Sequence, residues 1–399
     1  MKTGPLAGTR VLDLIDGAAA YGPKLVAGLG ADVIRVEPPD GSAQRRRQPL
    51  YEQVQDGQAG PSLHFLHYNA GKRGITLNLE VSEGQKVLQG LLDRVDIVFD
   101  NGQLDRLGFV PENLAQKSPP LVVVSVTAFG LRSTRTAWSA GDLICQAMSG
   151  MIGLFGYRDE RPARFGPEQA FEMSGLASAL GAAIALFGLR RTGQGEFVDI
   201  AIERVCTLVT FQMANASIYH QFGFQRGRRP MRETLHGVLY QARDGYVLFN
   251  AYREPERTLA LLQEFGAAED LPELRRRLSR AEFIADPRVE ETVARFVAGR
   301  TRTELVELAQ AQGIAGLPVN DVADLVADPF LQSRAFFVEV EHPELERTLG
   351  YTGAPVRFGV TPYRIGRRPP LLGEDNADVY AELGIDPDQL DTLRADGVV

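Results

Sequence analysis

Basic side chains in the first quarter of the chain could bind phosphate groups, which proteins recognise with cations and backbone N–H groups. Arg45, Arg46 and Arg47 stand in a row, and Lys72 and Arg73 form a second group just before an apolar stretch. Such side chains are also ordinary on a solvated surface. Both interpretations therefore stay open for each group.

Two further polar residues follow or precede apolar runs. Asn101 comes just after the apolar residues 95–99, where it could bind a ligand or cap the next turn. Asp142 heads an apolar helical stretch, and we interpret it as the N-cap of that helix. The 5 histidines are scattered along the chain, so no metal site is predicted.

The first forty residues predict the unit that would position these side chains. An apolar strand over 10–15 leads into a small-residue turn at 16–20, a short helix at 24–29 and a second strand at 33–36. Strand, helix and strand form a right-handed βαβ unit. Open sheets of this kind bind ligands at the carboxyl ends of their strands, so the turn is a candidate binding site.

The same alternation continues through the first half of the chain. Further strands are predicted at 75–79, 95–99 and 121–126, with helices between them. The expected fold class is therefore α/β, with a doubly wound parallel sheet. Residues 173–189 form a helix rich in Gly and Ala, which favours close packing against another helix. Near residue 222 the character changes, and a smaller α+β domain is predicted over 223–330.

Composition narrows the classes of partner. The net charge of -8 gives no general attraction to nucleic acid or to an anionic membrane. Cys145 and Cys206 lie in apolar runs and are expected to be free thiols in a reducing compartment. No signal pattern and no run of eighteen apolar residues is found, so we expect a cytoplasmic protein with no membrane partner.

Short segments spread over nearly the whole length resemble, in the same order, those of the family III CoA-transferases. This group includes formyl-CoA transferases, carnitine CoA-transferases and 2-methylacyl-CoA racemases. Each segment is weak alone, but the ordered set is specific. The matching segments are residues 5–14, 30–39, 71–73, 100–101, 124–130, 142–150, 192–195, 315–320, 338–343 and 368–374.

The resemblance implies a large domain built from both chain ends, 1–222 and 331–399, with the smaller domain 223–330 inserted between them. It implies an interlocked dimer and coenzyme A or acyl-CoA bound as substrate, without a permanent cofactor or a metal. It also assigns CoA binding to Lys72, Arg73 and Asn101, and Arg47 could meet the phosphates. The cationic segment that usually follows the family's Asn is missing here, because residues 102–105 read Gly-Gln-Leu-Asp.

The family's chemistry is covalent and uses an aspartate. That carboxylate attacks the donor thioester to form an acyl-enzyme anhydride, CoA re-attacks to leave an enzyme thioester, and the acceptor acid collects CoA from it. In relatives the aspartate lies four residues before the first glycine of the small-residue helix, which is Gly175 here. That position holds Phe171, whose ring cannot attack or carry charge.

Three explanations for Phe171 stay open. Glu172 or Glu168 could substitute for the aspartate, although Glu172 is rotated by about 100° on a helix. The chain could instead be a non-catalytic subunit that pairs with a homologous subunit carrying the aspartate, as in benzylsuccinate CoA-transferase. It could also be a CoA-binding scaffold or sensor without turnover. We favour the second explanation.

Racemase activity is not expected. Proton exchange beside a thioester requires a base on each face of the carbon. Relatives with this activity use a histidine after the Phe-Gly segment together with the aspartate. Residues 131–141 contain no histidine, and the aspartate is absent as well.

Overall fold

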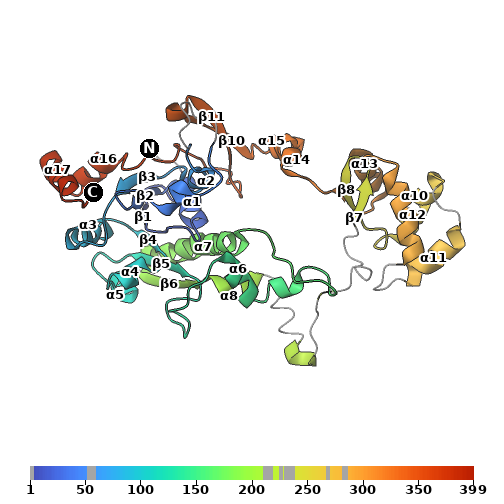
Figure 1. Ribbon diagram of the computed structural model, residues 1–399, viewed down its shortest axis with the longest axis horizontal. Helices are drawn as coiled ribbons and strands as arrows, with labels where there is room; N and C mark the ends of the chain where they lie inside the picture. The colour runs from blue at the N-terminus through green and yellow to red at the C-terminus, as the bar shows by residue number, and fades with distance from the viewer. Residues whose placement is uncertain are drawn as a thin grey trace. The chain divides into compact units, whose positions relative to one another are not determined.

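The computed structural model describes residues 4–51, 60–209, 219–223, 228, 239–266, 270–280 and 286–399. The chain divides into two compact units (Figure 1). The large unit is built from both chain ends, and residues 153–163 group with the smaller unit, which the sequence did not indicate. The large unit comprises Met1–Ile152, Arg164–Gln225 and Ser333–Val399, and the smaller one Gly153–Ala163 and Arg226–Gln332.

A six-stranded parallel sheet forms the centre of the large unit. Its strand order is β3-β2-β1-β4-β5-β6, so the predicted doubly wound sheet is confirmed. The order reverses direction between β1 and β4, and open α/β sheets bind ligands at such a position, at the carboxyl ends of the strands. The strands are β1 (Arg10–Asp13), β2 (Asp32–Glu37), β3 (Arg73–Thr76), β4 (Ile97–Asp100), β5 (Val122–Thr127) and β6 (Glu196–Ala201).

Strand residues point alternately to two apolar layers, which explains why the central strands are apolar throughout. Val11 and Val33 are paired in register and belong to the layer covered by α1 (Tyr21–Gly28) and α7 (Gln169–Thr192). Their neighbours Leu12 and Ile34 belong to the opposite layer, with α3 (Ser82–Leu92), α16 (Asn376–Glu382) and α17 (Pro387–Ala395). The C-terminal helices thus complete the core that the first strands begin.

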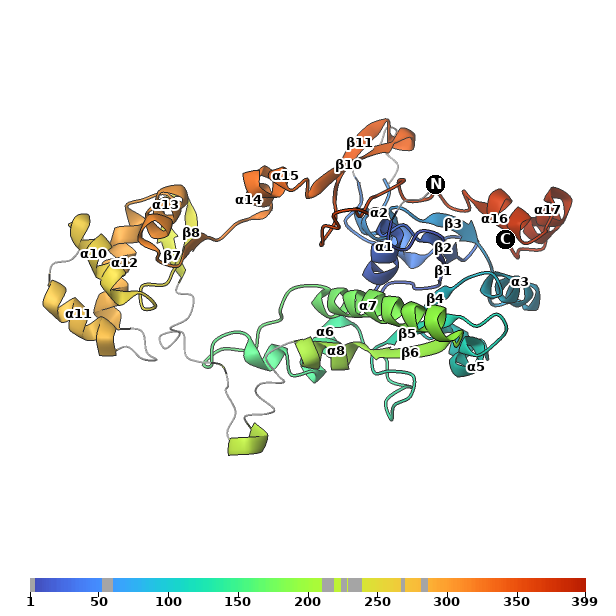
Figure 2. The same ribbon diagram turned by 180° about the vertical axis from the view of Figure 1, so that it is seen from behind.

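The helices of the large unit lie on the two faces of this sheet (Figure 2). They are α1 (Tyr21–Gly28), α2 (Leu63–Asn69), α3 (Ser82–Leu92), α4 (Gln103–Arg106), α5 (Pro111–Ala115), α6 (Asp142–Met148), α7 (Gln169–Thr192), α8 (Ile202–Val209), α16 (Asn376–Glu382) and α17 (Pro387–Ala395), with 3-10 turns η1 (Ala43–Arg46), η3 (Ile152–Leu154) and η5 (Pro343–Leu345). A separate hairpin pairs β10 (Phe337–His342) with β11 (Arg347–Thr352).

Strand β3 begins and ends earlier than predicted. It spans Arg73–Thr76 rather than 75–79. Its outer edge is occupied by side chains of the C-terminal segment instead of another strand. Asp375 accepts a hydrogen bond from the Gly74 N–H at 2.7 Å, and Asn376 accepts one from the Thr76 N–H at 2.9 Å. These contacts cover an edge that would otherwise be open for pairing.

Helices α1 and α7 touch at their backbones. A Cβ atom on Gly22 would lie 2.0 Å from the Ser178 hydroxyl oxygen, and one on Gly175 would lie 2.8 Å from the Tyr21 Cβ. Only glycine fits at either position. The close helix packing predicted from the small residues of α7 is therefore confirmed.

Helix α7 also has the length and apolar composition of a membrane-spanning helix. Core helices of globular domains share those properties, and 44% of its most apolar window is buried in the large unit. It packs on β5 and β6 as well as on α1. These contacts make α7 a core helix of the α/β layer.

The smaller unit has its own core. Its sheet joins β7 (Leu239–Ala242), β8 (Gly245–Phe249) and β9 (Gly316–Pro318) in antiparallel pairs, and β7 and β8 form a hairpin. Phe249 and Phe296 are buried at its centre. The helices that follow are α10 (Pro255–Glu264), α11 (Leu271–Arg280), α12 (Pro287–Ala298), α13 (Arg302–Gln312), α14 (Val322–Ala327) and α15 (Pro329–Ser333).

Candidate active site at the carboxyl ends of the strands

A buried charge cluster lies directly beneath the turn that follows β1. The Lys72 ammonium is fully buried and binds the Asp13 carboxylate at 2.8 Å and the Asn69 side-chain oxygen at 3.0 Å. Arg35 is equally buried, lies 3.7 Å from Asp13 and donates to the Ile15 carbonyl. Burial lowers the pKa of Lys72, and Asp13 opposes that effect. Lys72 therefore stabilises the base of the turn and faces no open surface.

Arg73 points toward the other end of the sheet. Its guanidinium binds Asp32, at the start of β2, at 2.6 Å and Glu382 of α16 at 2.7 Å. These ion pairs tie the C-terminal helix to the amino ends of the strands. The sequence suggested a phosphate contact for Arg73, but the structure places it away from the carboxyl ends where a ligand would bind.

Asn101 lies where the sequence placed it, just after β4. Its side-chain nitrogen donates to the Asp16 carbonyl at 3.1 Å and so joins two turns at the carboxyl edge. Its side-chain oxygen is buried and has no hydrogen-bond partner among the described residues. The Thr127 hydroxyl at the end of β5 is also buried without a hydrogen-bond partner in the described part of the chain. Buried polar atoms are rarely left unpaired, so this edge of the sheet has unused capacity to bind a polar ligand.

The three arginines after β2 have separate roles. Arg45 donates two hydrogen bonds to the Glu37 carboxylate, at 2.8 and 2.7 Å, and its guanidinium lies 3.9 Å above the Phe65 ring. Arg46 is exposed and donates only to the Asp40 carbonyl. Arg47 turns toward the start of α7. Of the three, Arg47 is therefore the one that reaches the helix where relatives keep their nucleophile.

Asp142 fixes the start of α7, a role that differs from its expected one. Gly141 is the N-cap residue of α6, so the Asp142 side chain is not the cap of its own helix. It accepts instead from the backbone N–H groups of Glu168 at 3.1 Å, Ala170 at 2.8 Å and Phe171 at 3.3 Å. The N-cap prediction was right about the chemistry and wrong about the helix, because α6 and α7 meet at this point. Gln146 holds the carboxylate at 2.7 Å.

Phe171 is in the first turn of α7 and packs against the apolar layer between that helix and the sheet. It contributes packing where relatives present a carboxylate. The structure thus shows no acid at this position, and the neighbouring acids must be judged by their own contacts.

Glu172 faces α2 and accepts a hydrogen bond from the Tyr68 hydroxyl. Burial raises the pKa of this carboxyl, although the Tyr68 hydrogen bond and the charge of Lys24 act in the opposite direction. Lys24 is 2% exposed, and its ammonium lies 3.1 Å from a ring nitrogen of His67. Burial lowers the pKa of Lys24 to about 7. Glu172 is therefore part of a buried polar cluster with partners of its own.

Glu168 is held by Arg47 and His64. One carboxylate oxygen accepts from Arg47, and the other lies 3.0 Å from the His64 Nε2. Burial and the charge of Arg47 lower the pKa of His64 to about 4, so its ring is neutral near pH 7. The backbone of Glu168 has a φ of 62°, which non-glycine residues seldom adopt. Both acids near Phe171 are thus engaged in hydrogen bonds.

Sequence reasoning missed Lys24, Tyr68 and His64. Tyr68 and His64 lie on α2. The His-Phe-Leu-His-Tyr run in this helix is a signal in the sequence, because polar aromatic residues recur at helical spacing in an otherwise apolar segment. Lys24 interrupts the apolar face of α1, a second signal, since lysine is almost never fully buried unless it has a partner. Their partners come from α7, which no local pattern reveals.

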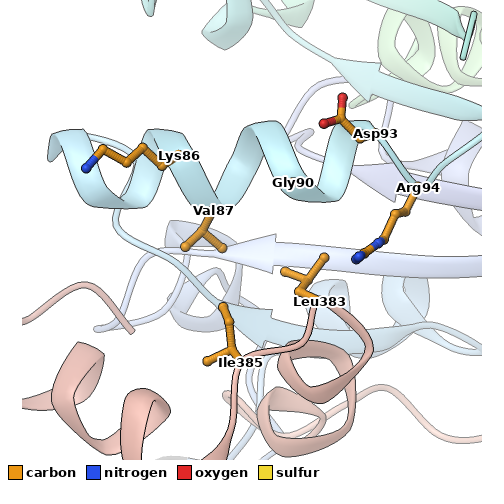
Figure 3. Close-up of a pocket in the computed structure, with 7 residues that line it drawn as sticks. All are labelled: Lys86, Val87, Gly90, Asp93, Arg94, Leu383 and Ile385. Atoms are coloured by element: carbon orange, nitrogen blue, oxygen red, sulfur yellow. The ribbon is translucent and has the colours of Figure 1, made fainter. Parts of the chain in front are cut away.

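Another hollow in the large unit, of about 360 Å³, lies between α3 and the turn after α16 and is lined by residues including Val87, Arg94 and Ile385 (Figure 3). Two of its charged groups are already paired, since Asp93 binds Lys117 and Arg94 donates to the Glu382 carbonyl. Within the described residues, no three His, Cys, Asp or Glu side chains form a group that could hold a metal ion.

Comparison with known proteins places these features in a family. The model of CoA-transferase family III matches residues 6–376. The chain is 33% identical to the succinyl-CoA:(R)-benzylsuccinate CoA-transferase subunit BbsE of Thauera aromatica, covering 98% of this chain and 97% of the relative. It is 29% identical to the succinyl-CoA:mesaconate CoA-transferase of Haloarcula marismortui, over 96% and 97% of the two chains.

Solved structures agree with the sequence comparisons. The fold superposes on the crystal structure of a CAIB/BAIF family protein from Brucella suis with a TM-score of 0.79 and 27% identity, covering 96% of this chain and 100% of the other. The strand order, the turn after β1 and the small-residue helix α7 agree with the resemblance noted from the sequence. The chain therefore belongs to CoA-transferase family III.

Proposed function

We propose that this chain is a subunit of an enzyme that moves CoA from a dicarboxylic acyl-CoA, such as succinyl-CoA, to a carboxylic acid, and that it does not supply the nucleophile. The observation that carries the proposal is Phe171 in the first turn of α7. A phenyl ring cannot form the acyl anhydride on which transfer depends. The relative from Thauera aromatica is itself named as a subunit, and its donor is succinyl-CoA.

The neighbouring acids support a non-catalytic role. Glu172 accepts from Tyr68, and Glu168 is held between Arg47 and His64. An attack on a thioester requires a free lone pair aligned within about 3–3.5 Å of the carbonyl carbon. To reach the position of residue 171, Glu168 would have to leave Arg47 and His64, and Glu172 would have to turn away from Tyr68.

CoA binding is proposed at the carboxyl edge of the sheet. The unpartnered oxygens of Asn101 and Thr127, next to the turn at 16–20, offer buried acceptors that a nucleotide could satisfy. Lys72 supports this edge through its ion pair with Asp13, whereas Arg73 ties α16 to the amino ends of the strands, so neither is proposed to touch the ligand. Coenzyme A enters and leaves as substrate, and the proposal requires no permanent cofactor.

The partner in this proposal is a homologous subunit with an aspartate at the position of Phe171, joined to this chain in an interlocked dimer. In that partner the aspartate would attack the thioester, release the CoA thiolate and exchange the acyl group for CoA. A cytoplasmic location belongs to the same proposal, since the two cysteines are buried and free. Neither nucleic acid nor a membrane is needed.

Trapping with hydroxylamine tests the role. The purified chain is incubated with succinyl-CoA and hydroxylamine, alone and with a homologous chain carrying the aspartate, and each polypeptide is weighed by intact mass spectrometry. The expected hydroxamate appears on the partner and never on this chain. A hydroxamate on this chain that disappears in Glu172→Gln or Glu168→Gln would show that it is catalytic itself. A homodimer that binds CoA but never turns over with any partner would favour a sensor.

A further inference from the structure

We propose that Arg47 and His64 form a binding site for the free carboxylate of a dicarboxylic acyl group, and that Glu168 occupies this site when no ligand is bound. The proposal rests on the proposed function only in that the chain binds acyl-CoA. It concerns recognition and requires no turnover by this chain.

The contacts around Glu168 are those of a carboxylate in a receptor site. Arg47 and His64 come from the loop after β2 and from α2, whereas Glu168 comes from the start of α7. The Arg47 side chain is 40% exposed, the Glu168 side chain 19% and the His64 side chain 11%. The cation thus faces solvent, with a neutral ring beside it, and a ligand could reach both.

His64 cannot satisfy both of its neighbours. Its Nε2 atom lies 2.9 Å from the Arg47 Nη1, which only donates, and 3.0 Å from a Glu168 oxygen, which accepts. With a proton on Nε2, the ring presents an N–H group to the Arg47 donor. Without that proton, the ring presents a lone pair to the Glu168 oxygen, which is itself an acceptor. In both tautomers the buried Nδ1 has no partner. Glu168 therefore fits this site imperfectly.

The backbone of Glu168 adds to the imperfect fit. Its left-handed φ of 62° would suit glycine, and it persists because Asp142 holds the residue's N–H and the following turn. Release of the side chain from Arg47 would leave that backbone anchor in place. Glu168 could thus leave the site without disturbing the start of α7.

Charge balance identifies the class of ligand. Exchanging the Glu168 carboxylate for another carboxylate keeps one anion against one guanidinium, and the planar fork of Arg47 matches a carboxylate in two parallel hydrogen bonds. A CoA phosphate is the other source of anionic oxygens. The position favours the acyl group, because Glu168 precedes Phe171 by three residues, about one helical turn from the place where relatives hold the reacting carbonyl.

Paired thioesters test the site. Succinyl-CoA and butyryl-CoA have four-carbon acyl groups and differ by the terminal carboxylate, so the ratio of their affinities, measured by calorimetry on the full chain, reports that group alone. Wild-type protein is expected to bind succinyl-CoA about tenfold more tightly or better, as for a charge-assisted hydrogen bond. Arg47→Gln should bring the ratio near one and leave butyryl-CoA unchanged. Arg46→Gln, its exposed neighbour, is the matched control and should keep the ratio.

A second variant shows whether Glu168 competes. Glu168→Gln removes the internal anion and should tighten succinyl-CoA while leaving butyryl-CoA unchanged, and thermal melts confirm that each variant is folded. The proposal fails if wild type binds the two thioesters equally or binds neither. It also fails if Arg47→Gln weakens both alike and lowers affinity for CoA more than for dephospho-CoA, because Arg47 then contacts a phosphate. Turnover by the chain alone would overturn its subunit role and leave these ratios unaffected.

Discussion

The Asp142 carboxylate accepts a hydrogen bond from the backbone N–H of Phe171 at 3.3 Å, so the position where the family resemblance implies a nucleophile is anchored by a residue of a different helix. The same carboxylate accepts from Glu168 and Ala170. The first turn of a helix has N–H groups without intrahelical partners, and Asp142 satisfies them from outside. The turn at 171 is thus held in place independently of which side chain it carries.

Removal of this anchor should destabilise the large unit. We expect Asp142→Ala to lower the free energy of unfolding by about 1–3 kcal/mol, because it leaves several buried donors unsatisfied. Urea denaturation followed by far-ultraviolet circular dichroism measures the change. Asp391→Asn is the matched control, since Asp391 is exposed and pairs only with Arg394, and its effect should stay within about 0.5 kcal/mol. Equal effects of the two variants would contradict the capping role.

A single substitution should restore the missing reactivity. Phe171→Asp places a carboxylate in the anchored turn, so incubation with succinyl-CoA and hydroxylamine should give a hydroxamate on the substituted residue. Loss of the half-buried ring should cost about 1–2 kcal/mol of stability. Phe171→Asn loses the same packing without gaining a nucleophile and should remain unmodified. Absence of an adduct in a folded Phe171→Asp variant would show that this chain presents no competent thioester site.

The buried Lys24 should make stability depend on pH. Its pKa is about 7 in the folded chain and near 10.5 when unfolded, so the unfolded state binds more protons between these values. Stability of the wild type should therefore rise with pH in this window, by about 1 kcal/mol per unit. Relative to wild type, Lys24→Met should be most stabilising below pH 7 and should lose that advantage by pH 10.

The matched control for Lys24 is Lys86→Met. Lys86 is exposed on α3 and, in the part of the chain that the structure describes, pairs with Glu83. Its stability difference from wild type should stay constant between pH 7 and 10. Chemical denaturation at one-unit pH intervals gives both differences, and a flat profile for Lys24→Met would show that the lysine titrates normally.

The contact between Tyr68 and Glu172 should show energetic coupling. A double-mutant cycle with Tyr68→Phe and Glu172→Gln isolates this pair, and a coupling energy of about 1–2 kcal/mol is expected for a hydrogen bond to a partly buried carboxyl. Tyr246→Phe, at an exposed tyrosine of the smaller unit, should show no coupling to Glu172→Gln. A coupling near zero would mean that Glu172 is free to move.

The fold could be predicted because its signals are local. Apolar runs such as 121–126, with glycines at turns, indicated strands buried on both faces, and the structure has β5 there. β3 was misplaced because residues at positions 375 and 376, far away in sequence, define its edge. Contacts with distant segments do not appear in the residue pattern of the strand whose edge they define.

The site was harder to predict for the same reason. The absence of an acid at Phe171 is visible in one position of the sequence, whereas the partners of Glu168 and Glu172 come from α2 and the loop before it. Lys72 was expected to bind CoA because the family resemblance assigns that role to its position. Asp13 holds it inside, and a strand-end aspartate beside a buried lysine cannot be paired by spacing alone.

The contact between α1 and α7 at Gly22 and Gly175 does not depend on the side chain at residue 171. The two backbones are in direct contact, so the helices cannot move closer together. Gly22 and Gly175, which take no part in chemistry, therefore set the distance between the turn after β1 and the start of α7. Residue 171 lies outside this joint. A change of side chain at residue 171 therefore leaves this contact between the two helices intact.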